Sequence, residues 1–235
     1  MPSVELIPVI DLMGGAVVHA RRGAREAYRP IETPLSASAA PLDVADGLLA
    51  LGAFRTLYIA DLDAIAGKSG HDAVLGRLAA RHPGLGLWVD AGEATPAALS
   101  RRVANGPGRP VVGSESLAGR AEAEAALAGG AGLLSLDYGA EGPRGPAELH
   151  ADAGLWPQAV IVMTLARVGA GQGPDIERLS GVLARAQGRR VYAAGGVRGA
   201  DDLHRLADLG VAGVLLASAL HDGRLSRADI AAFMG

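Results

Sequence analysis

The segment VYAAGGVRGADDLHRLADLGVAGVLLASAL, residues 191–220, alternates between two hydrophobic patterns. Its ends lie in short apolar runs, 190–194 and 213–217, which are typical of strands that are buried on both faces. Between them, Leu203, Leu206 and Leu209 recur at three-residue spacing and predict the apolar face of a helix. A strand, a helix and a second strand in about 30 residues form the unit from which parallel α/β sheets are built.

The same alternation runs along the whole chain. The predicted strands are 4–10, 56–60, 86–89, 110–113, 132–136, 159–163, 190–194 and 213–217. The predicted helices begin near residues 41, 71, 95, 119, 145, 174, 199 and 226. An open doubly wound sheet is one solution, but eight such units in 235 residues favour a closed (β/α)8 TIM barrel. No Pro- or Ser-rich linker interrupts the pattern, so we expect a single barrel domain over residues 1–235.

The chain also resembles itself, which predicts two half-barrel repeats over roughly 1–118 and 119–235. The spacing from Gly92 to Gly113 equals the spacing from Gly196 to Ala217. The first half is longer because an enlarged loop follows its first strand.

The composition excludes several classes of function. The formal net charge is −3 and no basic block occurs, so neither a nucleic acid nor an anionic membrane is expected as a partner. The absence of cysteine excludes disulfides and thiolate chemistry. The first residues lack the basic start of a signal peptide, and no long apolar stretch could span a membrane. We therefore expect a cytoplasmic protein, a monomer or small homo-oligomer, that binds a small molecule and needs no metal or other cofactor.

Two aspartates end apolar runs: Asp11 follows the first predicted strand and Asp137 the fifth. These strands lie opposite each other in an eight-stranded barrel, whose active site lies at the carboxyl ends of the strands. Two carboxylates there can act as general base and general acid, and we assign these roles to Asp11 and Asp137, respectively. The plain alternative is that each aspartate ends a strand or caps a helix. Thr164, after the sixth strand, either hydrogen-bonds a substrate or is a β-branched strand residue.

These residues lie in motifs that resemble a known family. IPVIDL, LYIADLDA, VVGSESL, LLSLDYG and the segment 191–220 are similar to the HisA/HisF family of histidine-biosynthesis barrels. The resemblance spans nearly the whole chain and is closer to HisA, as a divergent HisA-like branch. It implies a TIM barrel that acts as a cofactor-free aldose–ketose isomerase. Its reaction would be the Amadori rearrangement of a bis-phosphorylated aminoimidazole carboxamide ribotide (ProFAR).

The resemblance also implies the residues of the site. Asp11, Asp137 and Thr164 match the residues around the reacting carbons of the sugar. Gly195, Gly196, Ala217 and Ser218 match one phosphate cradle, and Gly92, Gly113 and Ser114 match the other. Glycine-rich turns that enter helices bind phosphate through bare backbone N–H groups, and Arg198 would add a charge to the first cradle.

The sequence departs from the family pattern at the second cradle, which reads Asp90-Ala91-Gly92-Glu93. Carboxylates repel phosphate at short range, so Asp90 and Glu93 would instead suit a cationic or amine-bearing end of the substrate. One alternative function is therefore that of a HisA-like paralogue with another substrate, for example in biosynthesis of a methanopterin- or methanofuran-type C1 carrier. The other is a non-catalytic barrel that binds a phosphorylated ligand.

The enlarged first loop carries His19 with Arg21, Arg22 and Arg25. These arginines either clamp an anion as the loop closes over the site or remain in solvent. The remaining histidines fall on predicted helices or their ends, away from the strand tips, so we expect them at the surface: His71, His82, His150, His204 and His221.

Overall fold

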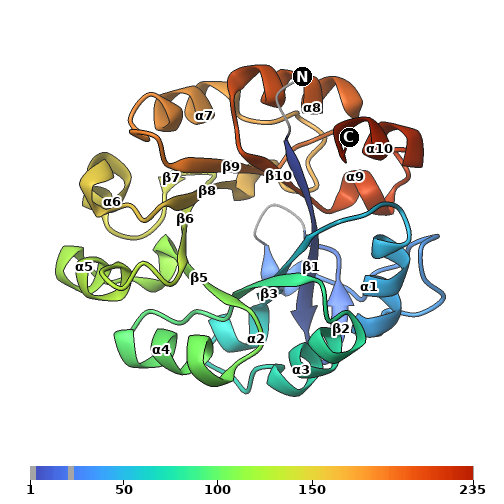
Figure 1. Cartoon of the computed structure of the whole chain (residues 1–235), viewed down its shortest axis with the longest axis horizontal. Coiled ribbons are helices and arrows are strands. Elements are labelled where there is room, and N and C mark those ends of the chain that lie inside the picture. Colours follow the sequence, from blue (N-terminus) through green and yellow to red (C-terminus); the bar gives the residue numbers. More distant parts are fainter. Residues whose placement is uncertain (1–3, 21–23, 235) are drawn as a thin grey trace.

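The computed structural model describes residues 4–20 and 24–234. Eight parallel strands form a closed barrel surrounded by helices (Figure 1), which confirms the predicted fold. In chain order these strands are β1 (Glu5–Met13), β3 (Thr56–Asp61), β4 (Gly86–Asp90), β5 (Arg109–Gly113), β6 (Leu133–Gly139), β8 (Ala159–Thr164), β9 (Arg190–Ala194) and β10 (Gly213–Leu216). The barrel closes where β10 pairs with β1, from Glu5 opposite Gly213 to Pro8 opposite Leu216.

Helices connect the strands around the outside of the barrel. The longer ones are α1 (Pro41–Leu49), α3 (Asp72–Arg81), α4 (Pro96–Asn105), α5 (Arg120–Leu127), α7 (Ile176–Leu183), α8 (Ala200–Leu209) and α10 (Arg227–Met234). Shorter segments are α2 (Leu62–Ile65), α6 (Ala147–Ala151), α9 (Ser218–His221) and the 3-10 turns η1 (Arg25–Ala27), η2 (Ser114–Ser116), η3 (Ala153–Leu155) and η4 (Leu165–Arg167). Side-chain caps define some starts: Thr95 accepts a hydrogen bond from Ala98 N at the start of α4. None of the helices in the described ranges is long and apolar enough to cross a membrane.

Two short hairpins at the carboxyl ends of the barrel were not predicted. β2 (Ala16–Val18) runs antiparallel to β1, and β7 (Gly142–Pro143) runs antiparallel to β6. The first hairpin turns at Gly14 and Gly15, whose φ angles of 59° and 81° favour glycine. One hairpin includes the strand of Asp11 and the other the strand of Asp137, so each hairpin extends the carboxyl end of the barrel beside one of these aspartates.

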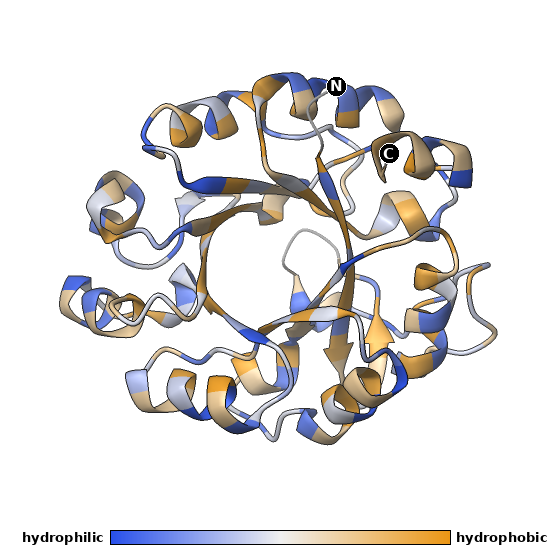
Figure 2. Ribbon diagram, viewed as in Figure 1, coloured by the Kyte–Doolittle hydropathy of each residue, from blue (hydrophilic) through white to orange (hydrophobic). Residues whose placement is uncertain are grey.

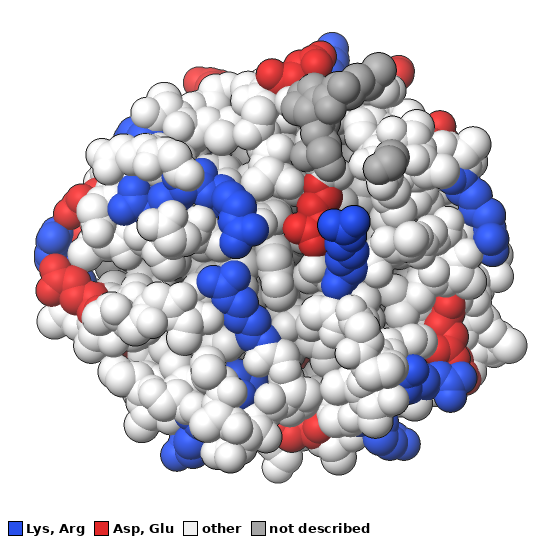
Figure 3. Space-filling model, viewed as in Figure 1, with Lys and Arg blue, Asp and Glu red and all other residues white. Residues whose placement is uncertain are grey.

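Apolar side chains fill the space between strands and helices and also the inside of the barrel. Figure 2 shows hydrophobic residues along the strands and on the inner faces of the helices. Inside the barrel, the Trp88 and Tyr192 rings meet edge to face with their centroids 4.9 Å apart. Charged groups near Tyr192 include Glu5, Arg109 and Arg190, at the amino ends of their strands. Figure 3 looks onto this end, where basic side chains and an acidic one surround the centre.

Candidate active site

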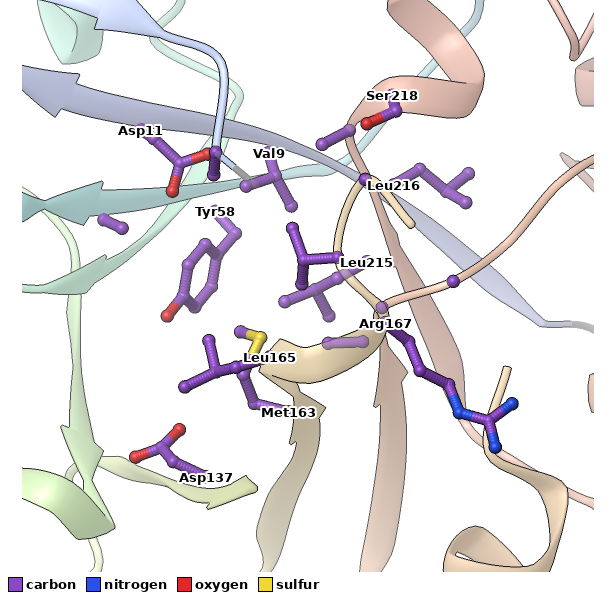
Figure 4. Close-up of a pocket in the computed structure, with 18 of the residues that line it drawn as sticks. Val9, Asp11, Tyr58, Asp137, Met163, Leu165, Arg167, Leu215, Leu216 and Ser218 are labelled. Carbon is purple, nitrogen blue, oxygen red and sulfur yellow. The ribbon is translucent and has the colours of Figure 1, made fainter. Parts of the chain in front are cut away.

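A pocket of about 1070 Å³, partly open to solvent, lies at the carboxyl ends of the strands. The strands β1, β4 and β6 and the turn η2 after β5 contribute the acidic part of its wall, which consists of Asp11, Asp90, Asp137 and Glu115. The segments after the last three barrel strands contribute Arg167, Gly195, Gly196, Ala217 and Ser218. Figure 4 shows Asp11 and Asp137 on two sides of Tyr58, with the Arg167 guanidinium turned away from both. The sequence-predicted aspartate pair therefore shares one pocket.

Asp11 and Asp137 differ in their surroundings. Burial raises the pKa of Asp11 to about 7, and the charge of Arg25 opposes this rise. Burial also raises the pKa of Asp137, to about 6, although three donors favour its ionised form. Ser135 Oγ donates to Asp137 Oδ1 (2.6 Å), while Ser114 Oγ and Glu115 N donate to Oδ2 (3.2 Å each). Burial without compensating donors therefore favours the protonated form of Asp11 more strongly than that of Asp137, whose three donors favour its charge.

Asp90 adds a third carboxyl group to the pocket. Burial, followed by the charge of Asp137, raises the pKa of Asp90 to about 7. Tyr58 OH donates to Asp90 Oδ2 over 3.3 Å. Tyr58 is 2% exposed, and its burial together with the nearby acids raises the pKa of this phenol well above its usual range. Tyr58 thus remains a hydrogen-bond donor in the middle of the acidic wall.

The residues of the second predicted phosphate cradle are engaged with these carboxylates. Gly92 N donates to Asp90 Oδ1 over 3.2 Å. Ser114 is fully buried, and its hydroxyl accepts from Asp137 N (2.9 Å) while it donates to the Asp137 carboxylate. A Cβ atom on Gly113 would lie 3.2 Å from Asp137 Oδ2 and 3.5 Å from Asp90 Oδ2. Glycine at this position therefore gives the two carboxyl groups room to approach each other.

Glu93 lies outside this arrangement. Its carboxylate contacts the Arg102 guanidinium at 3.0–3.1 Å, and Arg102 also pairs with Asp72. Arg102 is only 6% exposed, so this ion pair anchors the loop before α4 to the helix itself. The expectation that Glu93 faces the substrate is wrong, because the buried Arg102 in the second half of α4 pairs with it.

The first predicted phosphate cradle lines the pocket with glycines and other small residues. Gly195 and Gly196 have φ angles of 102° and 92°, and a Cβ atom on Gly196 would run into the carbonyl oxygen of Gly173. Ala217 and Ser218 complete this wall. Arg198 does not contribute, because its guanidinium pairs with Asp202 (2.8 Å) on α8. The cations beside this cradle are instead Arg167 and Arg224.

Thr164 and the histidines are not among the residues that line this pocket. Thr164 ends β8 with 4% exposure, and the pocket wall there is formed by its neighbours Met163 and Leu165. The expected surface position is wrong for His150 and His221, which are 7% and 5% exposed. His221 lies under the first loop, where its Nδ1 is 3.2 Å from Thr33 Oγ1, and burial lowers its pKa to about 4. Within the described residues, no group of three or more His, Cys, Asp or Glu side chains could hold a metal ion.

Comparison of the sequence with known proteins identifies the family of the chain. The family model described as histidine biosynthesis protein matches residues 148–226. The chain is 30% identical, over 94% of both sequences, to a Moorella thermoacetica protein named 1-(5-phosphoribosyl)-5-((5-phosphoribosylamino)methylideneamino)imidazole-4-carboxamide isomerase. The chain belongs to the histidine biosynthesis protein family. A protein of the same name from Symbiobacterium thermophilum is 28% identical over 99% of this chain and 97% of its own. An uncharacterized protein of Methanocaldococcus jannaschii is 30% identical over 97% of both.

The family-matched region, 148–226, carries the glycine-rich cradle, whereas all four pocket acids lie before it. Glu115 is one of these and was missed by sequence reasoning. It pairs with Arg25 of the first loop and with Arg144 after β7, the latter at 3.0 Å. Arg25 thus lines the pocket and does not stand in solvent. Arg21 and Arg22 lie outside the described residues.

A polar network that includes Asp61 and Asp63 lies beside Asp11, as one interpretation of these two acids predicts. Asp61 Oδ1 lies 2.9 Å from His71 Nδ1, and His71 Nε2 lies 3.0 Å from Gly15 N. Asp63 Oδ2 accepts a hydrogen bond from Gly14 N (2.6 Å). The network ties the β1–β2 turn to the segment after β3, and so it positions the rim next to Asp11. The sequence motif Asp61-Leu62-Asp63 indicates such a network, because both acids, on either side of one apolar residue at a strand end, need hydrogen-bond partners.

Proposed function

We propose that this member of the histidine biosynthesis family is an aldose–ketose isomerase that catalyses an Amadori rearrangement of a phosphorylated sugar amine of the ProFAR type. The observation that carries the proposal is the shared pocket of Asp11 and Asp137, whose pKa values of about 7 and about 6 lie near neutrality. Groups with such pKa values exchange protons efficiently at physiological pH. The relatives named as imidazole carboxamide isomerases support the reaction class.

The rearrangement needs one proton donor and one acceptor. The donor protonates the ring oxygen of the aminofuranose, and the ring opens to an iminium ion. The acceptor then removes the proton on C2, which leaves an enolamine. The enolamine takes up a proton at C1 and loses that of its 2-hydroxyl, which gives the ketose. The overall step is an isomerisation, so no oxidant or reductant is consumed.

The two aspartates divide these tasks according to their surroundings. Burial is the main influence on Asp11 and favours its protonated form, so Asp11 serves as the acid. Asp137 is held as a carboxylate by Ser135, Ser114 and the Glu115 amide, so it serves as the base. The phosphate group would bind at the other wall, where Gly195 and Gly196 leave backbone N–H groups accessible and Arg167 and Arg224 add positive charge.

Complementation of a strain that lacks the HisA isomerase tests the reaction. Growth is expected with the wild-type chain and should disappear with Asp11→Asn and with Asp137→Asn. The same substitution at the exposed Asp208 of α8 is the matched control and should support growth. No growth from a well-expressed wild-type chain would reject the ProFAR-type substrate.

The order of the two roles has its own test with purified protein and a ring-opened substrate analogue in D2O. Asp11→Asn should still exchange the C2 proton, because ring opening is no longer needed. Asp137→Asn should not exchange it. The reverse pattern would return the roles to those expected from the sequence.

A second candidate function is favoured by Asp90. A relative with the same proton chemistry but another phosphorylated sugar amine as substrate would account for an acidic group where the family resemblance implies a phosphate cradle.

A further inference from the structure

We propose that Asp90 determines substrate specificity: it makes the acidic wall of the pocket a site for a cationic nitrogen, so that the substrate carries one phosphate and one amino or amidino group. The proposal rests on the proposed function in one respect, because it takes this same pocket as the substrate site. It differs from the bis-phosphorylated substrate that the family resemblance implies.

The first argument concerns hydrogen-bond donors. A phosphate at the acidic wall would need backbone amides or hydroxyl groups, and two of the three predicted positions direct a donor to a carboxylate instead. The Gly92 amide is directed to Asp90, and the Ser114 hydroxyl to Asp137. The amide of Glu115 is also directed to Asp137. An incoming phosphate would meet carboxylate oxygens where it needs donors, and the two negative charges would repel each other.

The second argument concerns the charges of Asp90 and Asp137. One oxygen of each carboxyl group lies within 3.5 Å of the place that a Cβ atom on Gly113 would occupy, and the charge of Asp137 disfavours a second charge on Asp90. Two carboxyl groups that face the same residue and repel each other favour a bound cation over two free negative charges. Tyr58 donates a hydrogen bond to Asp90 but brings no positive charge. A ligand ammonium or amidinium group would supply both the charge and further N–H donors.

The third argument concerns the protein's own cations. Within residues 4–20 and 24–234, the structure shows no ion pair to Asp11, Asp90 or Asp137, and the nearest rim arginines, Arg25 and Arg144, are engaged with Glu115. The other wall has no acidic side chain among the described lining residues and combines the glycine cradle with Arg167 and Arg224, which also pair with Asp175 and Asp222. The pocket therefore has one acidic wall and one wall suited to an anion, which is complementary to a ligand with opposite charges at its two ends.

Isothermal titration calorimetry at pH 7 with three simple probes tests this complementarity without any need for turnover. The probes are glucosamine 6-phosphate, glucose 6-phosphate and fructose 1,6-bisphosphate. We expect glucosamine 6-phosphate to bind about 10-fold more tightly than glucose 6-phosphate, as a charged hydrogen bond in a partly buried site allows. Fructose 1,6-bisphosphate should bind more weakly than either monophosphate.

Asp90→Asn, which keeps the size and one acceptor oxygen of the side chain, should remove the preference for the amine and relieve the rejection of the bisphosphate. Glu93→Gln is the matched control, because Glu93 faces Arg102, and it should keep the wild-type ranking. Melting temperatures of both variants show that they are folded.

The wild-type chain gives an independent readout. Titrations in buffers with different ionisation enthalpies count the protons exchanged on binding. The described titratable or charged groups at the acidic wall are Asp11, Tyr28, Tyr58, Asp90, Glu115 and Asp137 with Arg25 and Arg144. Because the pKa values of Asp11, Asp90 and Asp137 lie at about 6 to 7, a cation there should release protons. Proton uptake on binding glucosamine 6-phosphate would contradict the proposal.

Three results would overturn it: equal or tighter binding of the bisphosphate to the wild-type chain, an amine preference that survives in Asp90→Asn, or no binding of glucosamine 6-phosphate at millimolar concentration. The proposed function fails separately. If complementation fails while the probe ranking holds, the bis-phosphorylated ProFAR-type substrate is rejected and the specificity of the pocket stands, and the proton-exchange test in D2O then decides whether the isomerase reaction does.

Discussion

The hydrogen bond from Ser135 to Asp137 offers a direct test of the proposed base. Ser135 is fully buried on β6, and its hydroxyl lies 2.6 Å from Asp137 Oδ1. Ser135→Ala removes this donor and leaves the two longer hydrogen bonds from Ser114 and Glu115. The carboxylate form of Asp137 loses stabilisation while its protonated form loses little, so the pKa of Asp137 should rise from its value of about 6.

A hydrogen bond to a charged group contributes about 1.5–3 kcal/mol, and 1.36 kcal/mol corresponds to about one pH unit. We take the lower end, because two donors remain, and expect the acidic limb of the kcat/KM profile to move up by about one pH unit. The ionised fraction of the base then falls about fivefold at pH 6 and hardly changes at pH 8.5.

The assay is the pH dependence of kcat/KM from pH 5 to 9 for the wild-type chain and Ser135→Ala. Ser180→Ala, which removes an exposed hydroxyl from α7, is the matched control and should leave the profile unchanged. An acidic limb that stays in place, or a loss of activity that is equal at every pH, would refute the assignment of Asp137 as a base tuned by Ser135.

Three further predictions concern stability and the two phosphate cradles. Asp90→Asn should raise the melting temperature more at pH 8 than at pH 4.5, because the cost of burying Asp90 grows from its unfolded-state pKa of 3.8 to its folded-state pKa of about 7, where it reaches up to a few kcal/mol; an equal gain at both pH values would contradict the cause. Gly196→Ala should lower the free energy of unfolding in urea by about 1–3 kcal/mol, because its φ is 92° and its Cβ would clash with Gly173, and it should weaken the binding of inorganic phosphate. Arg102→Met should cost about 3 kcal/mol in the same urea assay, because it leaves Glu93 without its buried partner, yet it should leave KM unchanged; a raised KM would mean that Glu93 reaches the substrate.

The barrel and the location of its active face follow from local features of the chain. Hydrophobic runs of strand length, three- and four-residue spacing in the helices and caps such as Thr95 are encoded within a few residues, so the sequence alone predicts them. Eight such units have one common closed arrangement, and strands one and five then bring Asp11 and Asp137 to the same rim. The pair could be predicted for this reason, because its geometry depends on strand count and not on side-chain detail.

Tertiary structure decided the chemistry of that rim. Glu93 and Asp90 are three residues apart and look equivalent in the sequence. In the structure, Glu93 pairs with Arg102, whereas Asp90 and Asp137 both face Gly113. The protonation states of the two catalytic candidates likewise depend on Ser135 and on the depth of burial. Hydrogen bonding and desolvation act between atoms within a few ångströms, and the partners come from segments far apart in the chain. The sequence by itself therefore determined that Asp11 and Asp137 lie at the same rim of the barrel. Only the folded structure determined how hydrogen bonds and burial shift the protonation of the pocket acids, and hence the charge that the pocket presents to its substrate.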